Sequence, residues 1–183
     1  MKIANFQAES VVNGPGKRAV LWFQGCTLAC PGCFNPHTHT KNAGENKTVQ
    51  DIIDWLRPLP VDGITLSGGE PFQQYPELLE LLKTIRQELP HLSIVIFSGF
   101  YLHELNKFGS EALELTDAVI AGRYEQTQHV GDKLIGSANQ EIVVFPHSIY
   151  TVEQFSDMKH SEVRIDTEGL IRITGIAPVL LNA

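Results

Sequence analysis

The sequence predicts an α/β fold built on a largely parallel β-sheet. Short, almost wholly apolar runs recur along the chain, and amphipathic helical patterns separate most of them. Apolar runs bounded by turn residues are typical of strands that are buried on both faces of a parallel sheet. The repeated strand–helix–strand order implies right-handed crossovers, and 183 residues with 43% hydrophobic content suffice for one core. Periodicity alone does not distinguish an open sheet from a partial barrel.

The N-terminal part of the chain predicts two strands followed by a helix. Residues 3–12 are extended and end at a turn of sequence NGPG at residues 13–16, after which residues 19–23 form a buried strand. Residues 48–57 form an amphipathic helix, because Thr48 is followed three residues later by an acidic side chain and then by apolar side chains at helical spacing.

The middle of the chain continues the alternation of strands and helices. The first of its two helices has Pro76 in its first turn and Pro90 just after its end, and the second is expected to break near Gly109. The expected strands are residues 63–67, 92–97, 117–121 and 141–145, and the expected helices are residues 76–89 and 101–115.

The C-terminal extension departs from this alternation. Residues 152–158 predict a short helix, and residues 162–174 alternate apolar and polar side chains across a turn at residues 167–169. This pattern predicts a β-hairpin, which either completes an edge of the sheet or forms a surface for a partner. We expect residues 1–183 to form a single domain, with a core at about residues 5–145 and the extension at about 146–183.

The composition limits the classes of function. A net charge of −7 without a long basic cluster gives no electrostatic signal for nucleic-acid binding. No stretch approaches the ~20 apolar residues that span a bilayer, and the N-terminus carries no apolar run of signal-peptide length. The three closely spaced cysteines argue against a secreted disulfide framework. The sequence therefore predicts a cytoplasmic protein without a membrane partner.

All three cysteines lie in one loop, which directly follows the strand at residues 19–23. Cys26, Cys30 and Cys33 have the spacing C-x3-C-x2-C, and thiolates are the ligands that iron–sulfur clusters and zinc prefer. A four-iron cluster held by three cysteines leaves one iron without a protein ligand, where chemistry could take place. The alternative is a Cys3His zinc site with His37 as the fourth ligand.

Four loop segments follow strands whose carboxyl ends should meet at one edge of the sheet. They are the cysteine loop and residues 68–70, 98–100 and 122–124. Ligands of parallel sheets bind outside this edge. The two glycines of residues 68–70 let the backbone approach a ligand closely, and the glutamate supplies a carboxylate suited to a ligand ammonium group. The alternative for this segment is a plain turn with an acid at a helix N-terminus.

The cysteine motif followed by Gly68-Gly69-Glu70 resembles the signature pair of radical S-adenosylmethionine enzymes. The resemblance sharpens to one branch, the activating proteins of anaerobic ribonucleotide reductase and related glycyl-radical enzymes, and covers about residues 5–145. The runs that carry it, in the order of that branch, are NGPG (13–16), GC (25–26), ACPGCFN (29–35), TLSGGEP (65–71), SGF (98–100) and GSANQ (136–140).

The resemblance implies a partial (βα) barrel and two cofactors. It implies a [4Fe-4S] cluster on the three cysteines, with the amino and carboxylate groups of S-adenosylmethionine chelating the open iron. It further implies that Gly68, Gly69 and Glu70 hold the amino group of this ligand and that Ser98 and Gly99 contact its ribose or carboxylate. Reductive cleavage would give a 5′-deoxyadenosyl radical that abstracts hydrogen, with the electron coming from an external donor of flavodoxin or ferredoxin type.

Three functions from different classes follow from these observations, in this order. The first is a radical oxidoreductase that activates a separate glycyl-radical enzyme. The second is a radical enzyme that acts directly on a peptide or a small metabolite, and the third is a non-catalytic zinc module. A family member with a cluster but no activity is a further alternative. The extension bears on the first function, because the small activases of this branch have little after the part that resembles residues 5–145.

Overall fold

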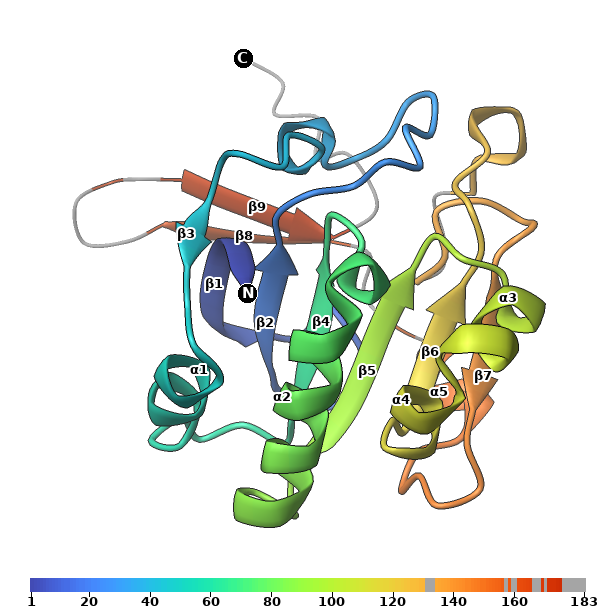
Figure 1. Ribbon diagram of the computed structural model, residues 1–183. Helices are drawn as coiled ribbons and strands as arrows, with labels where there is room; N and C mark the ends of the chain where they lie inside the picture. Colours follow the sequence, from blue (N-terminus) through green and yellow to red (C-terminus); the bar gives the residue numbers. More distant parts are fainter. Residues whose placement is uncertain (131–133, 157, 159–160, 166–168, 170, 176–183) are drawn as a thin grey trace.

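The computed structural model describes residues 1–130, 134–156, 158, 161–165, 169 and 171–175. Within them the main sheet has seven strands in the order β3-β1-β2-β4-β5-β6-β7 (Figure 1). Strands β2, β4, β5 and β6 are parallel, and the strands outside them pair antiparallel. The predicted, largely parallel α/β fold is therefore confirmed. The strands are β1 (Lys2–Ser10), β2 (Arg18–Phe23), β3 (Glu45–Asn46), β4 (Gly63–Gly68), β5 (Ser93–Ser98), β6 (Ala118–Ala121) and β7 (Glu141–Val144).

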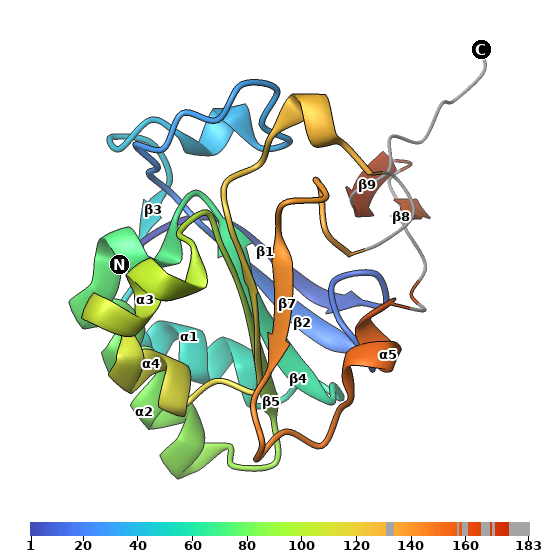
Figure 2. The same cartoon turned by 90° about the vertical axis from the view of Figure 1, so that its right-hand side faces the viewer.

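One face of this sheet is covered by helices (Figure 2). The helices bury one apolar side against the strands, as Leu78, Leu82 and Ile85 of α2 do. The predicted break near Gly109 separates α3 from α4. The helices on this face are α1 (Val49–Leu56), α2 (Tyr75–Glu88), α3 (Leu102–Phe108) and α4 (Ser110–Glu114).

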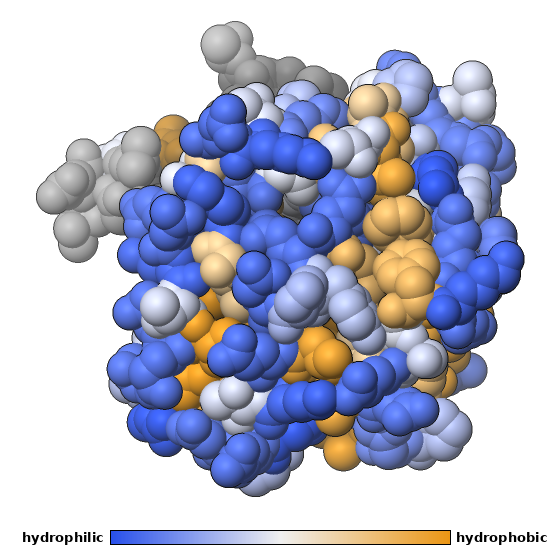
Figure 3. Space-filling model, viewed as in Figure 1, coloured by the Kyte–Doolittle hydropathy of each residue, from blue (hydrophilic) through white to orange (hydrophobic). Residues whose placement is uncertain are grey.

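The surface of the helix-covered side is largely hydrophilic, and its apolar side chains gather in small groups (Figure 3).

The start of helix α1 is determined by local hydrogen bonds. The Asp51 amide donates to Thr48 Oγ1 at 3.1 Å, and the Thr48 amide donates to Asp51 Oδ2 at 2.8 Å, so the two residues form a capping box. Within the described residues, no helix combines the length and the apolar character that crossing a membrane requires.

The opposite face of the sheet carries α5 (Val152–Ser156) and a separate two-stranded sheet (Figure 2). Of the predicted helix at residues 152–158, residues 152–156 form α5, residue 158 is not helical, and residue 157 lies outside the described residues. The predicted hairpin is confirmed as β8 (Ser161–Ile165) paired with β9 (Ile171–Gly175). The alternative that it completes a sheet edge is wrong, because β3 and β7 occupy the two edges. Of its predicted turn, residues 167 and 168 lie outside the described residues.

The hairpin is held against β1 and the turn that follows β1. Gln7 Nε2 donates to Glu162 Oε1 at 2.6 Å, and the amide of Val11 donates to the other oxygen of the same carboxylate at 3.2 Å. Asn13 Nδ2 donates to Thr174 Oγ1 at 3.2 Å. These contacts join residues that lie more than 150 positions apart in the chain. They hold the hairpin over the face of the sheet that the helices leave free.

A fully buried arginine links the amino ends of the central strands through hydrogen bonds. Arg18 donates from Nε to Thr65 Oγ1 at 2.8 Å, from Nη1 to Ser93 Oγ at 2.9 Å and Pro15 O at 3.1 Å, and from Nη2 to Ile64 O at 2.7 Å and Ser93 O at 2.9 Å. All five N–H groups of the guanidinium are therefore satisfied. Burial lowers the pKa of Arg18 to about 10, so the side chain stays charged at neutral pH.

Arg18→Met should lower the free energy of unfolding by about 3–5 kcal/mol, because it leaves several buried acceptors without donors. Urea unfolding followed by tryptophan fluorescence measures this loss. Arg57→Met is the matched control, since Arg57 forms an ion pair with Glu88 at the surface and its loss should cost less than about 1 kcal/mol. Equal stability losses in the two variants would contradict the role given to Arg18.

Candidate functional site

The carboxyl ends of the parallel strands converge on a small cavity of about 120 Å³. The eight residues that the sequence singled out as site residues all line this cavity, because their loops follow strands that end at the same edge of the sheet. These residues are Cys26, Cys30, Cys33, Gly68, Gly69, Glu70, Ser98 and Gly99. We refer to this cavity as the cysteine pocket.

The cysteine loop rests directly on the backbone of the glycine pair. The amide of Glu70 donates to Gly25 O at 2.9 Å. A Cβ added at Gly69 would overlap the carbonyl group of Gly25, and one added at Gly68 would lie 2.7 Å from the backbone of Phe23. The two glycines therefore permit close approach of neighbouring backbone, from the end of β2 at Gly68 and from Gly25 at Gly69. Their approach to a ligand stays a prediction.

The three cysteines are free and partly exposed, and main-chain amides lie within hydrogen-bond reach of two of the sulfurs. Burial raises the pKa of the Cys26 and Cys33 thiols. The main-chain amides of Leu28 and Ala29 counter this effect at Cys26, and that of Asn35 does so at Cys33. A bound metal centre would counter the cost of burying these thiolates further, because it supplies the missing positive charge.

The zinc alternative is not assembled in the structure. Within the part of the chain that the structure describes, no group of three or more His, Cys, Asp or Glu side chains surrounds a single metal-ion position. A structural zinc ion needs four ligands around one atom, whereas a four-iron cluster takes each thiolate on a different iron. His37, the expected fourth zinc ligand, lines a different and larger cavity. The donor set therefore fits a cluster better than a single ion.

Glu70 is fully buried and is held by three hydrogen bonds. Its Oε1 accepts from the Phe72 amide and from Ser98 Oγ, both at 3.0 Å, and its Oε2 accepts from the Gly99 amide at 2.7 Å. Burial raises the pKa of this carboxyl to about 7, although these hydrogen bonds and the charge of Arg123 oppose the shift. Ser98 and Gly99 therefore act on Glu70, a link that sequence reasoning did not foresee.

The Glu70 carboxylate keeps capacity for a cationic ligand. Two carboxylate oxygens offer about four acceptor positions, and the protein fills three of them. An ammonium group that enters the cysteine pocket would lower the pKa of Glu70 and make it ionise fully. The arrangement suits an amino group better than an anion.

The loop after β6 packs onto the cysteine loop through aromatic side chains, which the sequence did not mark as a unit. The rings of Phe34 and Tyr124 are 4.9 Å apart, and Tyr124 Oη lies 3.3 Å from His129 Nδ1. A Cβ added at Gly136 would lie 2.8 Å from the Phe34 ring, so the close packing of the two loops requires glycine there. Residues far apart in the chain thus join the cysteine loop to the loop after β6, and of these residues Tyr124 lines the cysteine pocket.

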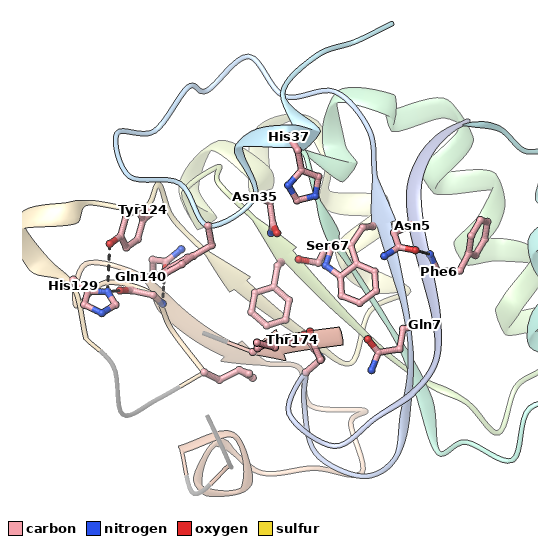
Figure 4. A pocket seen from close by; sticks show the side chains of 18 residues that line it. Asn5, Phe6, Gln7, Asn35, His37, Ser67, Tyr124, His129, Gln140 and Thr174 are labelled. Carbon is pink, nitrogen blue, oxygen red and sulfur yellow. Dashed lines mark hydrogen bonds between the residues drawn. The ribbon is translucent and has the colours of Figure 1, made fainter. Parts of the chain in front are cut away.

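A second cavity of about 640 Å³ lies beside the cysteine pocket, and we call it the large pocket. Ser67, Phe97, Tyr124 and Gln140 line both cavities, so the two cavities adjoin at these residues. Figure 4 shows side chains from β1, from the cysteine loop and from β9 around the large pocket. Sequence reasoning missed this cavity, because its walls come from both ends of the chain.

The chain resembles known proteins over most of its length. The family model described as "4Fe-4S single cluster domain" matches residues 12–143. The anaerobic ribonucleoside-triphosphate reductase-activating protein of Escherichia coli K12 is 34% identical over 152 residues, which cover 78% of this chain and 97% of that protein. The proteins of the same name from Haemophilus influenzae and from phage T4 are 34% and 31% identical, covering 78% and 72% of this chain and 97% and 86% of those proteins.

Among solved structures, the crystal structure of QueE from Escherichia coli is similar with a TM-score of 0.41 and 16% identity. The likeness covers 66% of this chain and 68% of that one, and it is too slight to carry an argument.

The cysteine pocket predicts which side chains a metal centre needs. Cys30→Ala should abolish the binding of iron and sulfide on anaerobic reconstitution, because no other thiol in the sequence can replace it. His37→Ala should bind as much iron and sulfide as the unchanged protein, since His37 lies in the large pocket. Iron and sulfide analysis with visible absorption measures both. Loss of metal in His37→Ala, or bound zinc in place of iron, would contradict this assignment.

The raised pKa of Glu70 predicts a pH-dependent stability. The unfolded carboxyl releases its proton near pH 4.5 and the folded one near pH 7, so the folded state holds the extra proton between these values. The contribution of Glu70 to the free energy of unfolding should therefore fall as the pH rises from about 4.5 to about 7.

Glu70→Gln removes this titration, so the fall between pH 5 and pH 7 should be smaller in the variant than in the unchanged protein. Urea unfolding of the metal-free proteins at pH 5, 6, 7 and 8 measures the difference. Parallel pH profiles of the two proteins would show that Glu70 does not titrate as the structure indicates.

Proposed function

Because the chain belongs to the anaerobic ribonucleoside-triphosphate reductase-activating protein family, whose members are radical S-adenosylmethionine enzymes with a 4Fe-4S domain, we propose that it activates a glycyl-radical ribonucleotide reductase. In this proposal it removes a hydrogen atom from a glycine of that partner. The family membership confirms the predicted superfamily and enzyme class, with a [4Fe-4S] cluster and S-adenosylmethionine as cofactors. It also excludes the non-catalytic zinc module.

The observation that carries the proposal is the cysteine pocket, in which three free cysteines and residues 68–70 line one cavity. Cys26, Cys30 and Cys33 would hold the cluster, because they are three free, partly exposed thiols that line one cavity. When bound, the two cofactors supply a one-electron reduction of the sulfonium group and the radical that abstracts hydrogen. An external donor of flavodoxin or ferredoxin type supplies the electron in this proposal.

In this proposal the residues of the chain bind and orient the ligand and shield the site from water. Glu70 offers its remaining acceptor position to the amino group of the ligand, and Ser98 and Gly99 fix the direction of that carboxylate. The side chains of Leu28 and Ile120 add apolar surface to the cysteine pocket, which helps to keep water out. Ser98 and Gly99 are therefore positioning residues in this proposal.

In this proposal the whole chain acts as one domain in the cytoplasm. The hairpin β8–β9 is hydrogen-bonded to β1 and to the turn after it, which supports a single unit. Three free thiols require a reducing compartment, because an oxidising one would promote their modification. The direct modification of a free peptide or small metabolite remains the second candidate, since the family match ends at residue 143 and leaves the hairpin unmatched.

The protein loaded with its cluster should form 5′-deoxyadenosine from S-adenosylmethionine when dithionite is present and oxygen is absent. Cys30→Ala should form none, and Glu70→Gln should form at least about tenfold less, because the ligand loses a charge-assisted hydrogen bond. Chromatography measures the product. Asn42→Ala is the matched control, since Asn42 is exposed and lies in neither pocket.

Addition of the anaerobic ribonucleotide reductase from the same organism separates the two candidates. Activation of that partner predicts a glycyl-radical signal in electron paramagnetic resonance and the appearance of reductase activity. Formation of 5′-deoxyadenosine without any radical on the reductase would point to the second candidate. The absence of 5′-deoxyadenosine despite a full cluster would contradict both.

A further inference from the structure

The short 3-10 helix η2 (Pro71–Gln74) directly follows Glu70 in the chain and is firmly held. Its first two residues, Pro71 and Phe72, are buried. The Phe72 amide donates to Glu70 Oε1, and the Gln73 amide donates to Glu70 O, both at 3.0 Å. The ring of proline also fixes φ at the first position of the helix. Side chains that leave η2 therefore start from a rigid backbone.

The side chain of Gln73 binds the cysteine loop through two hydrogen bonds. Its Oε1 accepts from the Thr27 amide at 3.1 Å, and its Nε2 donates to Thr27 Oγ1 at 2.8 Å. Thr27 comes directly after Cys26, so this carboxamide holds the loop beside its first cysteine. Two bonds from one planar group fix the direction of the Thr27 backbone as well as its position.

The turn that Gln73 holds is strained and places two amides beside a sulfur. Ala29 has a φ of 50°, a left-handed conformation that a residue with a Cβ adopts at a cost in free energy. The main-chain amides of Leu28 and Ala29 lie within hydrogen-bond reach of Cys26 Sγ. A strained turn persists only when contacts from outside maintain it, and Gln73 supplies two such contacts.

Amides beside a thiolate ligand favour the reduced form of an iron–sulfur cluster. Reduction from [4Fe-4S]²⁺ to [4Fe-4S]¹⁺ adds one electron, which the external donor supplies, and so increases the negative charge on the sulfurs. An N–H group directed at a sulfur stabilises this added charge, and hydrogen bonds to the sulfurs are one of the factors that set the reduction potential. Loss of these amides from the sulfur would make the cluster harder to reduce.

We propose that Gln73 is a positioning residue that keeps the Leu28 and Ala29 amides on Cys26 Sγ and thereby raises the reduction potential of the bound cluster. The inference rests on the proposed function, because it concerns the cluster that the three cysteines hold there. Gln73 is not among the residues that line the cysteine pocket, so it acts through the turn.

The test is a potentiometric titration of the full chain, loaded with its cluster, under anaerobic conditions. Electron paramagnetic resonance measures the amount of reduced cluster. Gln73→Leu keeps the size of the side chain and removes both bonds to Thr27. Its equilibrium constant for one-electron reduction should fall about threefold to tenfold, and a tenfold fall is a shift of about 59 mV to more negative potential.

Variants of Thr27 test the same contact from the other side. Thr27→Val loses the hydroxyl and keeps the amide, so its potential should shift in the same direction as that of Gln73→Leu and by less. Thr27→Ser keeps both bonds and should titrate like the unchanged protein. Adding Thr27→Val to Gln73→Leu should cause no further shift, because the two changes remove one interaction.

Gln74→Leu is the matched control for a purely structural effect. Gln74 leaves the same helix but binds elsewhere: its Oε1 accepts from the Lys2 amide at 2.6 Å, and its Nε2 donates to Lys2 O at 3.0 Å and Gln24 O at 2.9 Å. Its loss should lower the urea midpoint and leave the reduction potential unchanged. Gln73→Leu should show the opposite pattern, because Thr27 is exposed and its contacts add little to stability.

Hydrogen exchange of the metal-free proteins tests the positioning without a cluster. The amides of residues 27–29 should exchange faster in Gln73→Leu than in the unchanged protein, because the turn opens more often. In Gln74→Leu they should exchange at the unchanged rate. Circular dichroism shows that each variant is folded.

Three results would overturn the inference: an unchanged potential in Gln73→Leu, an equal shift in Gln74→Leu, or unchanged exchange of residues 27–29 in Gln73→Leu. Failure of the proposed function would look different. It would show in the unchanged protein, as a lack of bound iron and sulfide or as the absence of 5′-deoxyadenosine with dithionite.

Discussion

The site depends on a carboxylate that is buried at the carboxyl ends of the central strands. Glu70 links the end of β4 to the end of β5 through Ser98 and Gly99, and its backbone amide holds the cysteine loop at Gly25. At the opposite ends of the same strands, Arg18 joins β2 to β4 and β5 through five hydrogen bonds. Both groups use neutral partners, so hydrogen bonds rather than ion pairs offset the cost of burial.

Alternation along the strands divides the sheet into a structural face and a functional face. Leu21 and Ile96 point into the core under the helices, whereas their neighbours Trp22 and Phe97 line the large pocket. On the same face of the sheet, Phe155 of α5 is buried in a second, smaller hydrophobic core. Almost wholly apolar strands are therefore needed even though helices cover only one face, because the other face is filled by α5, the hairpin and the pocket walls.

The sequence was sufficient for the strands of the main sheet except β3, for the helices, and for bringing eight residues to the lining of the cysteine pocket. Each of these follows from local signals, such as apolar runs, the Thr48 cap and cysteine spacing, combined with the rule that parallel strands end at one edge. The pairing of Ser98 with Glu70 was not predictable, since both were expected to face the ligand independently. The large pocket was missed because it joins β1 to β9, and no local pattern specifies where a hairpin docks.

The loop between β6 and β7 couples the two cavities. Tyr124 and Gln140 line both, and Gln140 fixes the loop by accepting from Gly136 and donating to Gly122. The same loop packs through Gly136 on Phe34, one residue after the last cysteine. A shift of this loop would therefore change the walls of the large pocket and the position of the cysteine loop together. The shape of the large pocket and the position of the three cysteines thus depend on one segment.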